Sequence, residues 1–237
     1  MFATVKRKLT DESTSAVAAH AALAVVLQVR DGALQVLLWQ RALDPSRGSW
    51  SLPGGYLEHG ETLEESIRRH LAAKVDVREL SHLEQLDTRS DPERVPGEWQ
   101  LATTYLGLVP SDADPSLPDD TAWQPVDHLP PTAFDHGEIV LAGRDRLRAK
   151  LSYTNAGFAL APESFTISQL RRLYAAALGH DVSATNLQRV LLRRNVLVPT
   201  GGRREPGRSG GRPASLFRFR SRELAITDEF AVLRPPR

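Results

Sequence analysis

The segment from Gly54 to Val77, GGYLEHGETLEESIRRHLAAKVDV, decides the fold of the first part of this chain. Two glycines and a short polar loop lead into residues 61–74, which contain neither Gly nor Pro. Leu63, Ile67 and Leu71 are four residues apart and therefore share one face of a helix. The segment predicts a glycine-containing loop followed by an amphipathic helix that packs on one side.

Apolar segments on both sides of this helix predict strands. Residues 18–30 and 33–40 are rich in Val, Ala and Leu, and the Asp31-Gly32 dipeptide between them is typical of a two-residue hairpin turn. Residues 101–109 predict a third strand, and residues 140–151 predict a charged amphipathic helix. This mixed order, without an internal repeat, predicts a layered α+β domain.

The composition restricts the class of protein. The 237 residues include no cysteine, which excludes disulfides, thiolate catalysis and Cys-ligated zinc. We find neither a signal-peptide pattern nor the roughly 20 consecutive apolar residues that a membrane helix needs, so we expect a cytoplasmic protein that does not contact membranes. The length suits a medium domain followed by a small one.

Charge is distributed unevenly along the chain. Residues 1–163 carry 16 basic and 24 acidic side chains, a net charge of −8, whereas residues 164–237 carry 14 arginines and 5 acids, a net charge of +9. A basic last third indicates that this part contacts nucleic acid, although a basic surface that serves only solubility is the alternative.

The quoted segment resembles the Nudix box, the loop-helix motif of hydrolases that cleave nucleoside diphosphates linked to another moiety. Five residues stand at the spacing of that motif: Gly55, Glu61, Arg69, Leu71 and Val77. The resemblance implies an α/β/α Nudix-like sandwich, which we place at residues 18–155 after a flexible N-terminus at residues 1–17. It also implies that Glu61 and Arg69 brace the loop against the helix.

The metal-binding glutamates of the motif are absent. Their positions are occupied by His70, Ala73 and Lys74, and Asp76 stands where the motif has glycine. Three carboxylates at i, i+3 and i+4 share a helix face and could bind Mg²⁺ or Mn²⁺, which prefer oxygen ligands. An imidazole, a methyl group and an ammonium cannot replace them, so no metal would activate water there. We therefore expect no catalytic residues, no metal site and no required cofactor.

Remaining carboxylates leave one alternative open. Glu58, Glu64 and Glu65 could form a rewired metal site, or they could be a solvated acidic helix start favoured by the helix dipole. His70 is expected to pack or to lie at the surface rather than to bind a metal.

A Nudix-like pocket without its metal can still bind a nucleotide. An arginine that follows the second strand suits bidentate phosphate binding, and glycines let the backbone approach a ligand closely. Asp135-His136 is expected in a loop, where it would contact ligand or cap a helix, and three tryptophans offer base stacking or core packing: Trp39, Trp50 and Trp99. The expected effector-binding residues are Arg41, Leu52, Pro53, Gly54, Gly55, Glu58, Asp135 and His136.

Two helices with strong start signals follow. Thr166 can cap the first helix, Gln169 completes a reciprocal capping box, and Phe165 can pack on Leu170. Gly179 is expected to end this helix. A second helix starting at Ser183 would complete a helix-turn-helix.

The second helix carries the expected DNA-reading face. At about 100° per residue, Thr185, Arg189 and Arg193 lie together, with Asn186 at their edge. Arginine suits guanine or phosphate, and asparagine can read adenine. Strand-like residues 196–198 and 216–219 then flank a Gly-rich loop that resembles the wing of a winged helix. The loop's expected backbone or minor-groove contacts are Arg203, Arg204, Arg208 and Arg212.

The order of a Nudix-like domain and a winged helix-turn-helix at residues 156–237 resembles the Nudix-related transcriptional regulators of NAD metabolism. The resemblance implies a repressor of NAD biosynthesis or salvage genes that binds double-stranded operator DNA as a homodimer, with ADP-ribose or NAD as effector. The alternatives are an active Nudix hydrolase, such as an ADP-ribose pyrophosphatase with a basic accessory domain, and an RNA-associated Nudix protein. The helix-turn-helix pattern argues against the last.

Overall fold

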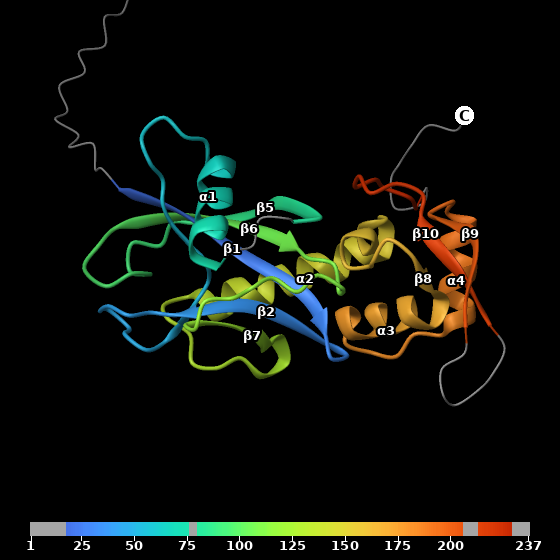
Figure 1. Ribbon diagram of the computed structural model, residues 1–237. Helices are drawn as coiled ribbons and strands as arrows, with labels where there is room; N and C mark the ends of the chain where they lie inside the picture. The colour runs from blue at the N-terminus through green and yellow to red at the C-terminus, as the bar shows by residue number, and fades with distance from the viewer. Residues whose placement is uncertain (1–17, 76–79, 206–212, 229–237) are drawn as a thin grey trace, which may run out of the picture.

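The computed structural model describes residues 18–75, 80–205 and 213–228. The first seventeen residues, for which we predict a flexible N-terminus, lie outside these ranges. The first part of the chain forms a seven-stranded sheet with helices on both faces, and the last part forms a small three-stranded sheet with two helices (Figure 1). The elements are β1 (Ala19–Arg30), β2 (Ala33–Gln40), β3 (Trp50–Ser51), β4 (Gly54–Tyr56), α1 (Leu63–Val75), β5 (His82–Arg89), β6 (Gln100–Leu108), β7 (Thr121–Pro125), η1 (Val126–His128), α2 (His136–Tyr153), η2 (Ala156–Ala159), β8 (Phe165–Thr166), α3 (Ile167–Leu178), α4 (Ala184–Arg193), β9 (Leu197–Arg204) and β10 (Ala214–Phe219).

The large sheet is built around β1. Its strand order is β3-β2-β1-β6-β5, with β4 also paired to β1 and β7 to β2. The β1–β2 hairpin turns through two residues, because Arg30 pairs directly with Ala33. Asp31 and Gly32 both have positive φ, as this tight turn requires. The hairpin predicted from the Asp-Gly dipeptide is confirmed.

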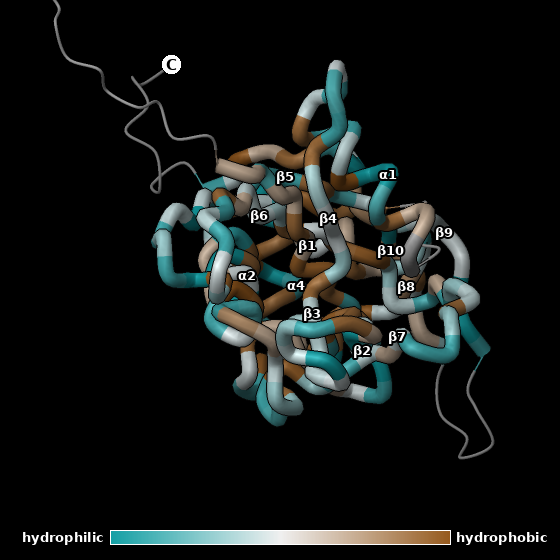
Figure 2. The backbone as a smooth tube through the Cα atoms, turned by 90° about the vertical axis from the view of Figure 1, so that its left-hand side faces the viewer, coloured by the Kyte–Doolittle hydropathy of each residue, from teal (hydrophilic) through white to brown (hydrophobic). Residues whose placement is uncertain are grey.

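Alternate residues of β1 pack on opposite helices, which makes the first part a three-layer sandwich. Leu23, Val25 and Leu27 belong to a core cluster that contains the buried face of α2. The small residues of the opposite face pack with Ile67 and Leu71 of α1. Figure 2 shows hydrophobic stretches at the centre of the molecule and hydrophilic loops around them. The predicted α+β sandwich is therefore confirmed.

Helix boundaries differ from the prediction at two points. Helix α1 begins at Leu63 rather than at residue 61, because Thr62 and Glu65 exchange capping hydrogen bonds there. Helix α2 begins at His136, four residues earlier than predicted. The prediction that His136 lies in a loop is therefore wrong. His136 is the first residue of α2, and its side chain is buried.

The last part is a winged helix. Thr166 and Gln169 form the predicted reciprocal capping box of α3, and Gly179 ends that helix in the left-handed conformation. Ser183 caps α4 by accepting a hydrogen bond from the backbone N–H of Asn186. The three strands are ordered β8-β10-β9, and the two-residue strand β8 was not predicted.

The wing strands are longer than predicted. Arg203 and Arg204 belong to β9, where they pair with Ser215 and Ala214 of β10. Their assignment to a loop is therefore wrong, because the glycines at 201 and 202 continue the strand instead of ending it. Arg208 and Arg212 lie outside the described residues.

The two parts share one hydrophobic core. The cluster that begins between β1 and α2 continues through η2 into α3, α4 and β10, with the fully buried Phe158 and Phe165 at the junction. The segment after β10 returns to the end of α2, where the Asn155 side chain donates to the carbonyl of Glu223 and accepts from the N–H of Ala225. The winged helix is thus docked on the sandwich (Figure 1).

Across the described ranges, every helix is too short or too polar to cross a membrane.

Candidate nucleotide site and nucleic-acid interface

Glu61 and Arg69 brace the loop before α1, as predicted. The two carboxylate oxygens of Glu61 accept from Nε and Nη2 of Arg69 at 3.0 and 2.6 Å. Glu61 also accepts from the backbone N–H of Glu58, while Arg69 donates to the carbonyl of Tyr56. These hydrogen bonds, mainly those from Arg69, lower the pKa of Glu61 to about 2.

His70 is a packing residue. Its side chain is buried, and its Nε2 donates to the carbonyl oxygen of Tyr56 at 3.0 Å. A Cβ atom on Gly55 would lie 2.4 Å from Cε1 of His70, so the ring occupies the space that only glycine leaves free. Ala73 lies exposed. The side chain of Lys74, together with Asp76 and Val77, lies outside the described residues.

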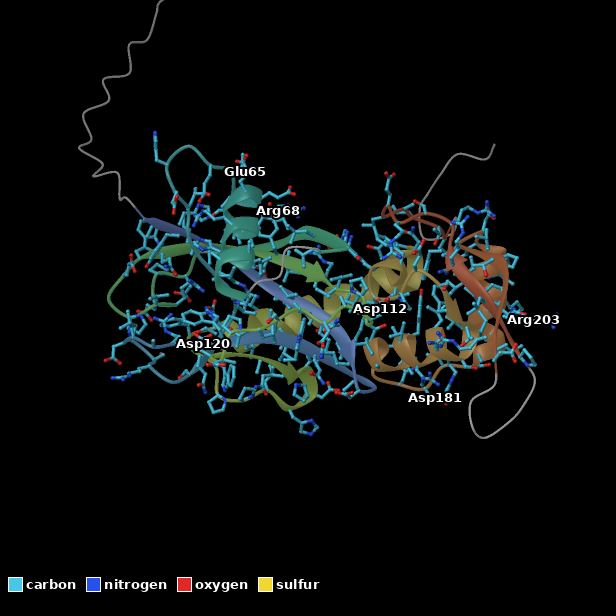
Figure 3. The ribbon with its side chains drawn as sticks, in the orientation of Figure 1. Glu65, Arg68, Asp112, Asp120, Asp181 and Arg203 are labelled. Carbon is cyan, nitrogen blue, oxygen red and sulfur yellow. The ribbon has the colours of Figure 1, made fainter. Side chains whose placement is uncertain are left out.

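The remaining carboxylates of this region form ion pairs or hydrogen bonds with neighbouring residues. Glu58 pairs with Arg69 at 3.2 Å, and Glu64 pairs with Arg68 one turn along α1 at 2.9 Å. Glu65 accepts from the backbone and hydroxyl of Thr62. Figure 3 shows Glu65 and Arg68 on the outer side of α1. Within the part of the chain that the structure describes, no three His, Asp or Glu side chains are grouped to hold a metal ion.

A second group of side chains gathers at the N-terminus of α2. The guanidinium of Arg41 lies over the ring of Phe134, 4.9 Å from its centroid, and Arg41 Nε donates to the carbonyl of Pro45. Phe134 has φ 53°, a left-handed conformation that is strained for a bulky residue. Such strain recurs at functional sites and makes this turn a candidate for ligand contact.

Arg94 holds this turn in place. It donates to both carboxylate oxygens of Asp135, at 2.6 and 3.1 Å, and to the side chain of Gln100 at 3.0 Å. Only 3% of the Arg94 side chain is exposed. Asp135 is the N-cap residue of α2, and its carbonyl accepts from the N–H of Ile139, but its side chain makes the ion pair with Arg94 and no capping hydrogen bond.

His136 holds the backbone that connects β3 to β4. Its Nδ1 accepts from the backbone N–H of Leu52 at 3.0 Å, and the residue is 5% exposed. Burial lowers the pKa of His136 to about 4, so the ring is neutral at pH 7 and its Nδ1 is free to accept. The hydrogen bond fixes the tautomer, with the proton on Nε2.

The backbone of residues 52–55 is committed to the protein. The carbonyl of Leu52 accepts from the indole of Trp39, and the carbonyl of Pro53 accepts from the N–H of Ala24. A Cβ atom on Gly54 would lie 2.1 Å from the carbonyl oxygen of Ala22. The two glycines are thus required by the close packing of β1 and α1 against them, and a role for residues 52–55 in effector binding stays a prediction.

Two aromatic rings of this domain are exposed, and one of them, Tyr56, lies close enough to Arg41 to feel its charge. Tyr56 is 50% exposed and Trp99 is 42% exposed. The Tyr56 hydroxyl donates to Glu98 at 2.8 Å, and burial together with this carboxylate raises the pKa of Tyr56. Trp39 and Trp50 instead anchor the loop and pack against the core. A cation beside an exposed ring, as with Arg41 and Tyr56, suits a ligand that combines phosphate with a planar base.

The structure divides the predicted effector residues into two groups. Arg41, Leu52, Asp135 and His136 meet at the start of α2, whereas Glu58 belongs to the brace around Arg69. The sequence analysis missed Arg94, Phe134 and Tyr56. Arg94 has no local signal, because it lies in a polar loop 41 residues from its partner.

The outward face of α4 has the predicted composition. Thr185, Asn186, Arg189 and Arg193 are exposed, while Leu187 and Leu191 on the other side are buried. Arg189 donates to the Asn186 side chain at 2.8 Å, which holds both groups at the surface. Arg203 and Arg204 are exposed on β9, and Figure 3 shows Arg203 at the end of the molecule distant from α1. Helix and wing together form a basic surface.

Comparison with known proteins matches both parts. Residues 19–142 match the NUDIX domain model, and residues 157–219 match the model of the NrtR DNA-binding winged helix domain. The chain is 29% identical over 201 residues to the ADPR responsive transcriptional repressor NtrR of Acinetobacter baylyi, covering 82% of this chain and 79% of that protein.

Solved structures agree with these matches. The crystal structure of Shewanella oneidensis NrtR complexed with a 27mer DNA superposes with a TM-score of 0.71 at 31% identity, covering 84% of this chain and 93% of that one. The NUDIX domain of the same protein complexed with ADP ribose gives a TM-score of 0.52 at 31% identity, covering 58% of this chain and 93% of that domain. The chain therefore belongs to the NrtR family of Nudix-related transcriptional regulators.

Proposed function

We propose that this protein is a transcriptional repressor of NAD biosynthesis or salvage genes whose Nudix domain senses ADP-ribose, with NAD as the second candidate effector. The observation that carries the proposal is the docking of an NrtR-type winged helix, with its basic face outward, on a Nudix sandwich through one shared core. The Acinetobacter baylyi relative is an ADPR responsive transcriptional repressor, and Shewanella oneidensis NrtR has been crystallised with a 27mer DNA and its NUDIX domain with ADP ribose.

The nucleotide is bound and left intact. The α1 positions of the metal-binding glutamates hold His70, Ala73 and Lys74, and His70 is committed to packing under Gly55. A divalent ion placed there would find no carboxylate at these three positions. Without an ion, this helix face cannot activate water or neutralise a pyrophosphate.

The effector site lies at the N-terminus of α2. Arg41 provides the cation for the phosphates, and the exposed rings of Tyr56 and Trp99 stack on the base. Asp135 and His136 act beneath the ligand through Arg94 and Leu52 rather than at its surface. The backbone of residues 52–55 forms the floor, and Glu58 lies at the edge beside α1.

The operator is read by α4 and the wing. Thr185, Asn186, Arg189 and Arg193 enter the major groove, while Arg203, Arg204, Arg208 and Arg212 contact phosphates. A homodimer places two such helices about one DNA turn apart on a near-palindromic operator. Residues 18–155 form the effector domain and residues 156–237 the DNA-binding domain, and bound ADP-ribose lowers operator affinity by changing the spacing of the two DNA heads.

A gel-shift titration tests this function. The full chain is first used to select a duplex from a randomised DNA pool, and ADP-ribose, NAD and AMP are then added in parallel series. We expect ADP-ribose or NAD to release the duplex and AMP to be weaker. Indifference to every nucleotide would remove the sensor function.

A second assay separates the sensor from an enzyme. The protein is incubated with ADP-ribose and Mg²⁺, and the products AMP and ribose phosphate are measured. We expect no turnover beyond the rate without protein. Substantial turnover that is lost in Glu64→Gln or Glu65→Gln would favour the hydrolase instead.

A further inference from the structure

We propose that helix α2 carries the effector signal to the DNA-binding helices and that Arg148 is the residue that couples them. This inference rests on the proposed function, because it concerns how the nucleotide site controls operator binding. Helix α2 has 18 residues and therefore spans about 27 Å. Its two ends touch the two functional regions.

The N-terminal end belongs to the nucleotide site. His136, the first residue of α2, accepts the N–H of Leu52, and the preceding Asp135 is held by Arg94. The strained Phe134 links this turn to Arg41. A ligand that engages Arg41 or displaces residues 52–55 therefore moves the start of α2.

The middle of α2 is closely packed, so a displacement at its N-terminus reaches its C-terminus. A Cβ atom on Gly143 would lie 2.7 Å from Val25 Cγ1, so α2 lies directly against β1. Ile139, Val140 and Leu147 are fully buried in the same cluster. Close-packed interiors transmit displacement instead of absorbing it.

Arg148 joins α2 to the turn of the helix-turn-helix. Its Nε donates to the carbonyl oxygen of Ala177 at 3.2 Å, in the last turn of α3, where carbonyls lack helical partners. The guanidinium also fills the space beside Gly179, since a Cβ atom there would lie 2.4 Å from Nη2 of Arg148. Gly179 is the left-handed residue that ends α3 and begins the turn to α4.

The end of α4 is tied to the same helix. Arg194, the residue after α4, donates to the carbonyl of Ser152 in the last turn of α2 at 2.8 Å. Arg194 also pairs with Asp228, whose backbone N–H donates to the carbonyl of Tyr153. Both DNA-binding helices thus terminate on the C-terminal half of α2.

The β1–β2 hairpin also reaches α3 at this junction. A hollow of about 390 Å³ separates the β1–β2 turn at Gly32 from Arg171, Arg172 and the end of α3. A second hollow of about 210 Å³ lies beside it, between Val29 and Leu173. The hairpin is thus a second contact between the sandwich and α3, beside the one that α2 makes.

The experiment measures coupling in the full-length chain. Operator affinity is determined by fluorescence anisotropy with and without saturating ADP-ribose, and ADP-ribose affinity by calorimetry with and without the selected duplex. Each measurement gives a ratio, namely the affinity without the second ligand divided by the affinity with it. Thermodynamic linkage requires the two ratios to agree, and for allosteric proteins they are roughly 5- to 150-fold. The variants are Arg148→Ala and Arg148→Lys, with Arg144→Ala as the control one turn earlier. Arg144 pairs only within the sandwich, with Asp145 and Asp127, among its described ion pairs.

In Arg148→Ala we expect both ratios to fall below about 2-fold while each ligand still binds in the absence of the other. Arg148→Lys should recover part of the coupling, and Arg144→Ala should behave like the wild type. A purely structural role for Arg148 would lower both affinities and leave the ratios unchanged, which would overturn the proposal. Full ratios in Arg148→Ala would overturn it while leaving the proposed function intact. A wild-type protein with no response to ADP-ribose would remove the proposed function and the coupling together.

Discussion

The buried imidazole of His136 accepts a hydrogen bond from the backbone N–H of Leu52, 84 residues away in the sequence. This contact joins the first turn of α2 to the loop that precedes β4. Because a protonated ring cannot accept through Nδ1, the contact exists only while His136 is neutral. The turn at the start of α2, where we propose that the nucleotide binds, is therefore sensitive to acid through His136.

The pH dependence of stability tests this contact. The pKa of His136 is about 4 in the folded chain and near 6.5 when the chain is unfolded. Because the folded pKa is depressed, the unfolded chain binds the extra proton first, so stability falls as the pH drops from 6.5 to 4, by about 3 kcal/mol. His136→Asn keeps a hydrogen-bond acceptor that does not titrate. Its free energy of unfolding, measured with urea at each pH, should therefore lack this decrease between pH 6.5 and 4. An equal decrease of the unfolding free energy with falling pH in both proteins would contradict a buried, neutral His136.

The glycine pair before α1 predicts two different outcomes. Gly55→Ala brings a methyl group against the His70 ring, and overpacking of this kind costs about 1–3 kcal/mol. Adding His70→Ala should relieve part of that cost. Gly54→Ala meets the backbone of Ala22, so the same second change should not rescue it. Thermal unfolding of the single and double variants checks both, and rescue of Gly54→Ala would contradict the packing described.

Loss of Arg94 should affect both stability and effector binding. Arg94→Ala leaves Asp135 without its bidentate partner, and breaking a buried pair costs about 3–5 kcal/mol. The double variant Arg94→Ala with Asp135→Ala should be less destabilised than the sum of the single variants. Calorimetry should find weaker ADP-ribose binding in both single variants. Strict additivity of the two changes would argue against the pair.

The basic surface predicts two classes of DNA variant. Arg189→Ala should cost about 1–3 kcal/mol and relax specificity at one operator position, because this residue lies on the outward face of α4. Arg203→Ala on the wing should weaken binding to all duplexes alike. It should also reduce the slope of log affinity against log salt concentration by about 1. Arg68→Ala, on α1, is the matched control and should change neither quantity. Affinity measured over a salt series with matched and mutated duplexes separates the two classes.

Local signals in the sequence were sufficient for much of the fold. The Asp31-Gly32 turn, the helix stripe of Leu63, Ile67 and Leu71, and the capping box of Thr166 each depend on residues within a few positions of one another. Such signals report backbone preferences directly, and all three predictions are confirmed.

Long-range contacts had no comparable signal. Strand β5, HLEQLDTR, has no apolar alternation and is a strand because it pairs with β6. The glycines of β9 indicated a loop, although pairing with β10 holds them in a strand. At the nucleotide site, Arg94 meets Asp135 across the fold, and this partnership follows from tertiary packing alone. The sequence therefore named Arg41 and His136, which meet at the start of α2, but not the residues that support them, and their role in effector binding stays a prediction.

The central claim is tested most directly by the operator affinity of the full chain. This affinity is measured by fluorescence anisotropy on the selected duplex while ADP-ribose is added. Chromatography of the same samples shows whether the ADP-ribose stays intact. We predict that affinity falls by at least about 5-fold while ADP-ribose remains uncleaved. An operator affinity that does not change at saturating ADP-ribose, or a change that appears only as AMP accumulates, would contradict the account.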